Sequence, residues 1–132
     1  MPIIKVISHR RPPSTRKYQG WAELLGPLFD TPSASIRFVW QKAAPGEVFN
    51  WGAQMGKANP GPIVSLVYRD RLSSAQLEKV YVQLLELMSD YTDCDLADVF
   101  IYVQRLQAGD VCVGGRVWLG KKKYKFLKTS HE

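Results

Sequence analysis

The sequence has few of the residues that build metal centres, disulfide frameworks or membrane spans. Its 132 residues include two cysteines, Cys94 and Cys112, and two histidines. That is too few for a disulfide scaffold or a cysteine-rich zinc site. No apolar run approaches the roughly 20 residues that cross a bilayer, and no signal-peptide pattern precedes Pro2. These shortages argue against a disulfide-rich secreted module and a membrane partner, and favour a cytoplasmic protein without a metal or other cofactor.

Positive charge is in excess, and the excess lies near the C-terminus. The chain has 18 basic and 12 acidic residues, and six of the basic ones lie between Arg116 and Lys128 without an acid among them. The rest of the chain is therefore neutral. The tail could serve a nucleic-acid binder, or pair as an edge strand with a neighbouring subunit. Because a mixed aromatic and basic platform is confined to residues 121–128, we expect no nucleic-acid partner.

The chain contains an internal repeat. Residues 2–7 read PIIKVI and residues 62–67 read PIVSLV, and each copy leads into a basic cluster and a serine-containing helix start. A repeat of this length indicates that one supersecondary unit occurs twice. We expect a single domain over residues 1–132, divided into unit one (2–55), a linker (56–61), unit two (62–115) and a basic C-terminal tail (116–132).

Each unit reads as strand, helix, strand and hairpin. In unit one we expect a strand at 3–8, a helix from Ser14 or Thr15 to about Leu25 that ends before Gly26-Pro27, a strand at 34–41 and a hairpin-like segment at 48–52. In unit two the strands fall at 62–68 and 99–103. The helix between them begins with the capping-box pair Ser73 and Gln76.

This element order predicts the fold and an oligomer. A crossover through a helix gives parallel strands with a right-handed connection. Two tandem units therefore predict an α+β fold, in which a four-stranded sheet carries two helices on one face. The other face of the sheet still needs covering, which points to an oligomer.

Two tandem β-α-β units that open with Pro-Ile resemble the tautomerase superfamily. The segments PIVSLVYRDRLSSAQLEKVYVQLL and VFIYVQRLQAGDVCVGG of unit two are similar to 4-oxalocrotonate tautomerase. The duplication resembles the fused members, which include malonate semialdehyde decarboxylase and cis-3-chloroacrylic acid dehalogenase. This resemblance spans residues 2–116 and implies a tautomerase/MIF-like fold, a homotrimer and an isomerase with a small carboxylate substrate.

The resemblance also implies a set of site residues. Pro2 corresponds to the N-terminal proline that family members use as a general base or acid. Arg69 and Arg71 match an arginine pair that holds the substrate carboxylate in the fused decarboxylase and dehalogenase. Arg37 matches an arginine that polarises a carbonyl in 4-oxalocrotonate tautomerase, and Tyr102 matches a tyrosine that orders water in the dehalogenase.

Only one of the two repeated prolines can act as a base. Trimming of the initiator methionine, which is normal before proline, would leave Pro2 as a free secondary amine, whereas the nitrogen of Pro62 is an internal tertiary amide. A base for proton transfer needs a pKa near the working pH, and an α-amine lies lower than a lysine. Arg69 and Arg71 would lower it further and bind the carboxylate, and Arg37 would stabilise an oxyanion.

The chain departs from the specialised members of the superfamily. Ile36 stands where the decarboxylase has an acid, and Val113 stands where the dehalogenase has a glutamate. The helix histidine of the dehalogenase falls among Leu28 and Phe29. We therefore expect keto-enol tautomerisation of a small 2-oxo or enol carboxylate. Two alternatives stay open: a hydratase or dehalogenase acting on an unsaturated or halogenated acid through protonated Pro2, and a non-catalytic scaffold or nucleic-acid-binding protein.

Overall fold

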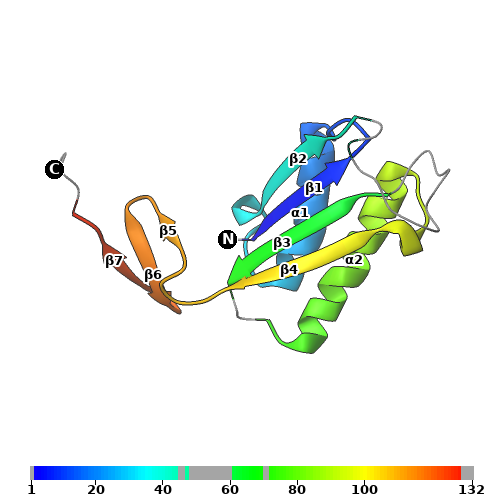
Figure 1. The fold of residues 1–132 in the computed structure, drawn as a ribbon. Coiled ribbons are helices and arrows are strands. Elements are labelled where there is room, and N and C mark those ends of the chain that lie inside the picture. Colours follow the sequence, from blue (N-terminus) through cyan, green and yellow to red (C-terminus); the bar gives the residue numbers. More distant parts are fainter. Residues whose placement is uncertain (1, 45–46, 48–60, 70–71, 129–132) are drawn as a thin grey trace.

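Four strands form one mixed sheet. A computed structural model describes residues 2–44, 47, 61–69 and 72–128. Its sheet has the order β2-β1-β3-β4, shown in Figure 1, with strands β1 (Ile3–Ser8), β2 (Arg37–Lys42), β3 (Ile63–Arg69) and β4 (Phe100–Leu106). The pairs β1/β2 and β3/β4 are parallel, and β1 and β3 are antiparallel. The predicted α+β fold of two tandem β-α-β units is confirmed.

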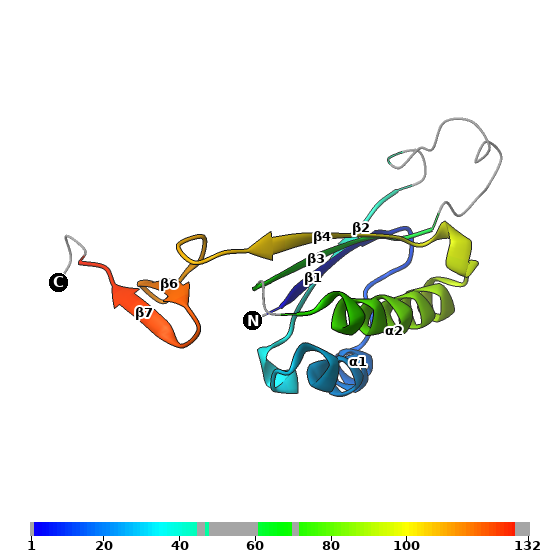
Figure 2. The ribbon, with the colours of Figure 1, turned by 90° about the horizontal axis from the view of Figure 1, so that it is seen from below.

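Two helices cover one face of this sheet, as Figure 2 shows. α1 (Thr15–Phe29) begins at Ser14, and α2 (Ser74–Thr92) begins at Ser73, where the expected capping box is formed. In the capping box the amide of Gln76 donates to the Ser73 hydroxyl at 3.2 Å, and the amide of Ser73 donates to Gln76 Oε1 at 2.8 Å. These bonds satisfy amides that lack partners within the helix.

Both units follow the same course after the helix. Asp30 is the C-cap of α1 and Asp93 is the C-cap of α2, and both aspartates adopt a left-handed conformation, with φ of 52° and 53°. A short 3₁₀ turn follows in each unit, η1 (Ser33–Ser35) and η2 (Leu96–Asp98), and leads into the second strand. The backbone therefore repeats the duplication that the sequence shows.

Two predicted boundaries of unit one were wrong. α1 does not stop before Gly26-Pro27 but continues to Phe29. Proline lacks one amide donor, yet the last turn is closed because the amides of Asp30 and Thr31 donate to the carbonyls of Pro27 and Gly26 at 3.3 and 3.0 Å. The second strand begins at Arg37 and not at residue 34, because Ser33–Ser35 form the 3₁₀ turn. The segment 48–52 lies outside the described residues.

The core lies between the sheet and the helices. Alternate residues of β1 and β3 point to the helices and are fully buried, among them Ile4 and Leu66. They meet apolar side chains of α2 such as Leu84 and Met88. At the α1 side the core is aromatic, with contacts among Tyr18, Trp21, Phe38, Trp40 and Tyr91.

The opposite face of the sheet is not covered by any described part of this chain (Figure 2). Its residues are the alternate set of each strand, and several of them are apolar. Val39, Phe100 and Tyr102 are 40%, 61% and 49% exposed. Lys5 and Arg37 add charge to the same face. An apolar face of this kind is typical of an interface between subunits.

A second, smaller sheet follows β4. β5 (Cys112–Val113), β6 (Arg116–Gly120) and β7 (Lys123–Phe126) pair antiparallel beyond the end of β4 (Figure 1). The basic tail therefore contributes β6 and β7, which pair with each other within the chain, and pairing with a neighbouring subunit stays a prediction. Across the described ranges, no helix combines the length and apolarity needed to span a membrane.

Candidate active site

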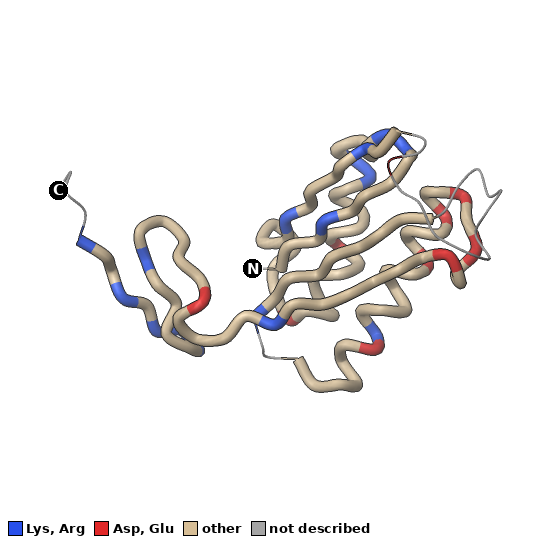
Figure 3. Tube along the Cα trace, in the orientation of Figure 1, with Lys and Arg blue, Asp and Glu red and all other residues tan. Residues whose placement is uncertain are grey.

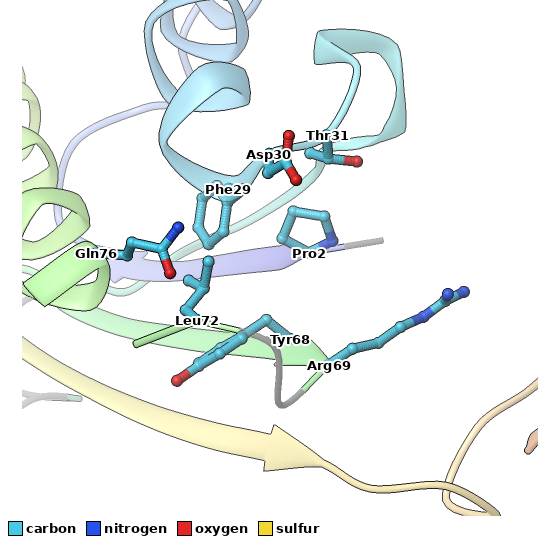
Figure 4. A pocket seen from close by; sticks show the side chains of 8 residues that line it. All are labelled: Pro2, Phe29, Asp30, Thr31, Tyr68, Arg69, Leu72 and Gln76. Atoms are coloured by element: carbon cyan, nitrogen blue, oxygen red, sulfur yellow. The ribbon is translucent and has the colours of Figure 1, made fainter. Parts of the chain in front are cut away.

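A pocket of about 170 Å³ lies at the end of the main sheet where β1 begins and β3 ends. Two strands and the ends of both helices contribute to it, as Figure 4 shows. It is lined by Pro2, Phe29, Asp30, Thr31, Tyr68, Arg69, Leu72 and Gln76. The pocket thus joins Pro2 and Arg69, which were two of the residues predicted from the sequence to share a site.

The sheet register explains why these two residues meet. Ile3 stands opposite Val67 in the antiparallel pair, so the start of β1 lies beside the end of β3. Pro2 itself is buried, and its carbonyl accepts the amide of Arg37 at 3.0 Å. This bond anchors Pro2 to the first residue of β2, and the proline ring lies beside Phe29 (Figure 4).

Arg69 occupies the edge of the pocket and not its floor. Its side chain runs away from Phe29 and Leu72 (Figure 4). Its guanidinium carbon lies 5.0 Å from the ring centroid of Trp118 and 5.6 Å from that of Tyr124, both in the C-terminal sheet. The charge is therefore held by two aromatic faces at the pocket mouth. Arg71 lies outside the described residues, so its place in the site stays a prediction.

Arg37 and Tyr102 do not line this pocket. Arg37 lies at the same end of the sheet, opposite Ile3, but its side chain belongs to the uncovered face and borders a separate depression beside α1. Tyr102 pairs with Ser65 in the middle of the uncovered face, and its ring lies 6.1 Å from that of Phe100. Within one chain the structure groups Pro2 with Arg69 and leaves these two residues apart, so their roles stay predictions.

Four polar residues of the lining were missed by sequence reasoning: Asp30, Thr31, Tyr68 and Gln76. The resemblance could have pointed to Asp30, because this residue directly follows Leu28 and Phe29, the two positions that match the dehalogenase histidine. Gln76 was noted only for its capping role, which also places its side chain at the pocket. Tyr68 is buried and accepts a hydrogen bond from Arg105 Nε at 3.0 Å, so its hydroxyl is fixed.

The arrangement provides one acid and one cation around a proline ring. Asp30 and Arg69 are the charged residues of the lining. Among the described residues, no three histidine, cysteine, aspartate or glutamate side chains cluster closely enough to hold a metal ion. Chemically, the pocket offers a cationic edge for an anionic substrate group and, where Pro2 is N-terminal, an amine beside it.

Solved structures share this fold. The chain is similar to the F6 fused 4-OT, described as an asymmetric trimer, with 15% identity over 87% of this chain and 94% of that one and a TM-score of 0.73. The Q0 fused 4-OT, a symmetric trimer, matches with 17% identity over 89% and 95% and a TM-score of 0.73. Malonate semialdehyde decarboxylase matches with 14% identity over 85% and 90% and a TM-score of 0.64. No family model and no curated protein sequence matches the chain.

Proposed function

We propose that this protein, which has the fold of the tautomerase superfamily, is a tautomerase acting on a small 2-oxo or enol carboxylate. The single observation that supports the proposal is a pocket of about 170 Å³ that both Pro2 and Arg69 line, with Arg69 at its edge. A base must lie within hydrogen-bond reach of the proton that it moves, and the substrate must be held there. This pocket provides a residue for each task.

In the proposed reaction, removal of Met1 leaves Pro2 with a free secondary amine. The substrate carboxylate binds Arg69, with Arg71 as a second cation. The nitrogen of Pro2 takes the proton from the enol hydroxyl, and the electron pair moves to form the ketone as the carbon is protonated from the same amine. No proton is gained or lost overall. Arg37 stabilises the oxygen charge that develops, and it would act from a neighbouring copy, since its side chain lies outside the pocket of its own chain.

The test compares the two prolines. Pro2→Ala should lower turnover of an enol carboxylate strongly, while circular dichroism and the assembly state are unchanged, because the substitution keeps the carbonyl that accepts the amide of Arg37. Pro62→Ala is the matched control: its amide nitrogen carries no proton, and its carbonyl accepts the amide of Phe100 at 3.1 Å in the way that Pro2 binds Arg37. Equal large losses in both variants would contradict the proposal. Intact mass should show a chain that lacks Met1.

A second candidate is favoured by Asp30. A carboxylate in the lining beside Pro2 stabilises a protonated amine and can orient water, which suits a hydratase or dehalogenase that acts on an unsaturated or halogenated acid. Assays with an enol acid and with a halogenated acrylate separate the two. Asp30→Asn should abolish the second activity and leave tautomerisation largely intact.

The protein acts as a homotrimer in this proposal. Two fused 4-OT structures with the same fold are trimers, and the uncovered face of the sheet exposes Phe100 and Val39. Light scattering should give three times the 15.0 kDa chain mass, and Phe100→Glu should lower it. Val82→Glu, on the exposed side of α2, is the matched control. A mass near that of one chain at micromolar concentration would overturn this assembly.

A further inference from the structure

A second basic cluster lies at the opposite end of the main sheet from Pro2. Because β1 and β3 are antiparallel, the turn that follows β1 and the turn that follows β3 lie at opposite ends. The turn after β1 forms an open basin of about 450 Å³ that is lined by His9, Arg10, Arg11, Lys42 and Tyr91. Figure 3 shows basic positions gathered where β1 leads into α1. None of the described residues of this lining is acidic.

The backbone of this turn is fixed from three sides. The amide of Arg10 donates to the Ser8 hydroxyl at 3.0 Å. The indole of Trp40 donates to the carbonyl of Arg10 at 2.9 Å, and the hydroxyl of Tyr91 donates to the carbonyl of Arg11 at 2.8 Å. Strand β2 and helix α2 thus hold the turn that bears the arginines. A site that is ordered before binding loses less entropy when a ligand arrives.

The side chains are also oriented. His9 donates from Nδ1 to the carbonyl of Ala43 at 2.9 Å. The guanidinium carbon of Arg10 lies 5.3 Å from the centre of the Tyr91 ring, and Nζ of Lys17 lies 5.4 Å from it. Arg11 and Lys42 line the same basin, so four basic side chains gather in this part of the surface. Like charges at this density repel one another, and a bound anion relieves the repulsion.

We propose that this basin binds a small dianion, either inorganic phosphate or a dicarboxylate, at a site separate from the Pro2 pocket. Two guanidinium forks suit the paired oxygens of either group, and Lys42 adds a point charge. Pro62 precedes β3 at this end of the sheet, but its nitrogen is an amide, so the repeat supplies no base here. The site is assigned a ligand here and no reaction. It goes beyond the proposed function and does not depend on it.

The test is an NMR titration of ¹⁵N-labelled protein with sodium phosphate and, separately, with sodium malonate, at ionic strength kept constant with sodium chloride. We expect saturable shifts of the amides of residues 8–11, Lys42 and Tyr91 with at least one of the two anions, and the anion that saturates identifies the group. Arg10→Ala and Lys42→Ala should each weaken binding about ten-fold or more. Lys42 lies on β2, outside the turn that bears Arg10, so its variant serves if loss of Arg10 disturbs the turn.

Two control variants make the result decisive. Lys79→Ala removes the same charge from an exposed position of α2, twelve residues before Tyr91 and so about 18 Å away along the helix, and it should bind as the parent does. Arg69→Ala should also bind normally. If Lys79→Ala weakens binding equally, or if the amide shifts rise linearly with anion concentration and do not saturate, the shifts report nonspecific attraction of anions. Either result would overturn the proposal. Loss of binding in Arg69→Ala alone would place the anion in the Pro2 pocket and overturn it as well.

Discussion

The guanidinium of Arg69 lies 5.0 Å from the ring centroid of Trp118, forty-nine positions further along the chain. Arg69 lines the Pro2 pocket, whereas Trp118 is a buried residue of the C-terminal sheet. The same arginine lies over Tyr124, which pairs with Trp118 across β6 and β7. The small sheet therefore holds the cation that we propose binds substrate. We accordingly expect the packing of this sheet to affect the affinity of the site.

Substitutions in β7 test this coupling. Tyr124→Leu removes one of the two rings that hold Arg69, so we expect KM for a carboxylate substrate to rise about three- to ten-fold, in line with a cation–π contact of about 0.5–2 kcal/mol. The value of kcat should change little, since the contact is the same in the ground and transition states. Steady-state kinetics give both constants.

Phe126→Leu is the matched control for Tyr124→Leu. Phe126 lies on the same face of β7, and its ring centroid is 6.0 Å from the guanidinium of Arg116, not of Arg69. Its loss should leave KM near the parent value. If both variants raise KM equally, the C-terminal sheet acts by general stability and not by holding Arg69.

Much of the main domain could be predicted from the sequence because its signals are local. The Pro-Ile repeat, the helical spacing of apolar residues and the capping pair Ser73 and Gln76 each lie within a few positions, and all appear in the structure. The end of α1 does not follow from the sequence, because a proline such as Pro27 ordinarily ends a helix. The turn at Asp30 and the burial of Phe29 compensate for the missing hydrogen bond.

The site was harder to predict because it depends on contacts between distant segments. Pro2 and Arg69 meet through the antiparallel register of β1 and β3, which duplication alone does not fix. Nothing in the spacing of Trp118 and Tyr124 reveals that their rings lie against Arg69. The position of Arg37 follows from strand alternation, which turns its side chain to the uncovered face.

Gly61 should tolerate no side chain. It has φ of +85°, and an added Cβ would press on the backbone oxygen of Asp98. Gly61→Ala should therefore destabilise the protein by about 1–3 kcal/mol through strain, measured by urea unfolding. Gly20→Ala is the control, since Gly20 lies within α1 with nothing within 4 Å of an added Cβ, and it should stabilise by about 0.5–1 kcal/mol. A neutral Gly61→Ala would show that the loop before β3 can move aside.

Tyr18 should contribute to unfolding at high pH. Burial, and secondly the nearby Tyr91, raise the pKa of Tyr18 above its ordinary value of 10.0. The folded state thus holds this proton more tightly than the unfolded state. Its contribution to stability is complete below pH 10.0 and is lost as the pH rises through the folded-state pKa. Tyr18→Phe keeps the stacking on Phe38, at 5.1 Å, and should flatten the fall in unfolding free energy above pH 10. An unchanged slope would assign that fall to other groups.

Ser73 and Ser14 cap equivalent helices, but only one of them is tied to the pocket. Ser73→Ala removes a hydroxyl that accepts the amide of Gln76, and Ser14→Ala removes one that accepts the amide of Lys17, each at 3.2 Å. Each loss should cost about 1 kcal/mol of unfolding free energy. Gln76 also lines the Pro2 pocket, and its Oε1 accepts the amide of Ser73. Ser73→Ala keeps that amide but removes the hydroxyl bond that fixes the backbone of residue 73 against Gln76, so it should lower kcat/KM beyond its effect on stability. Ser14→Ala should leave kcat/KM unchanged, and equal kinetic losses in both variants would show that the capping box does not position Gln76.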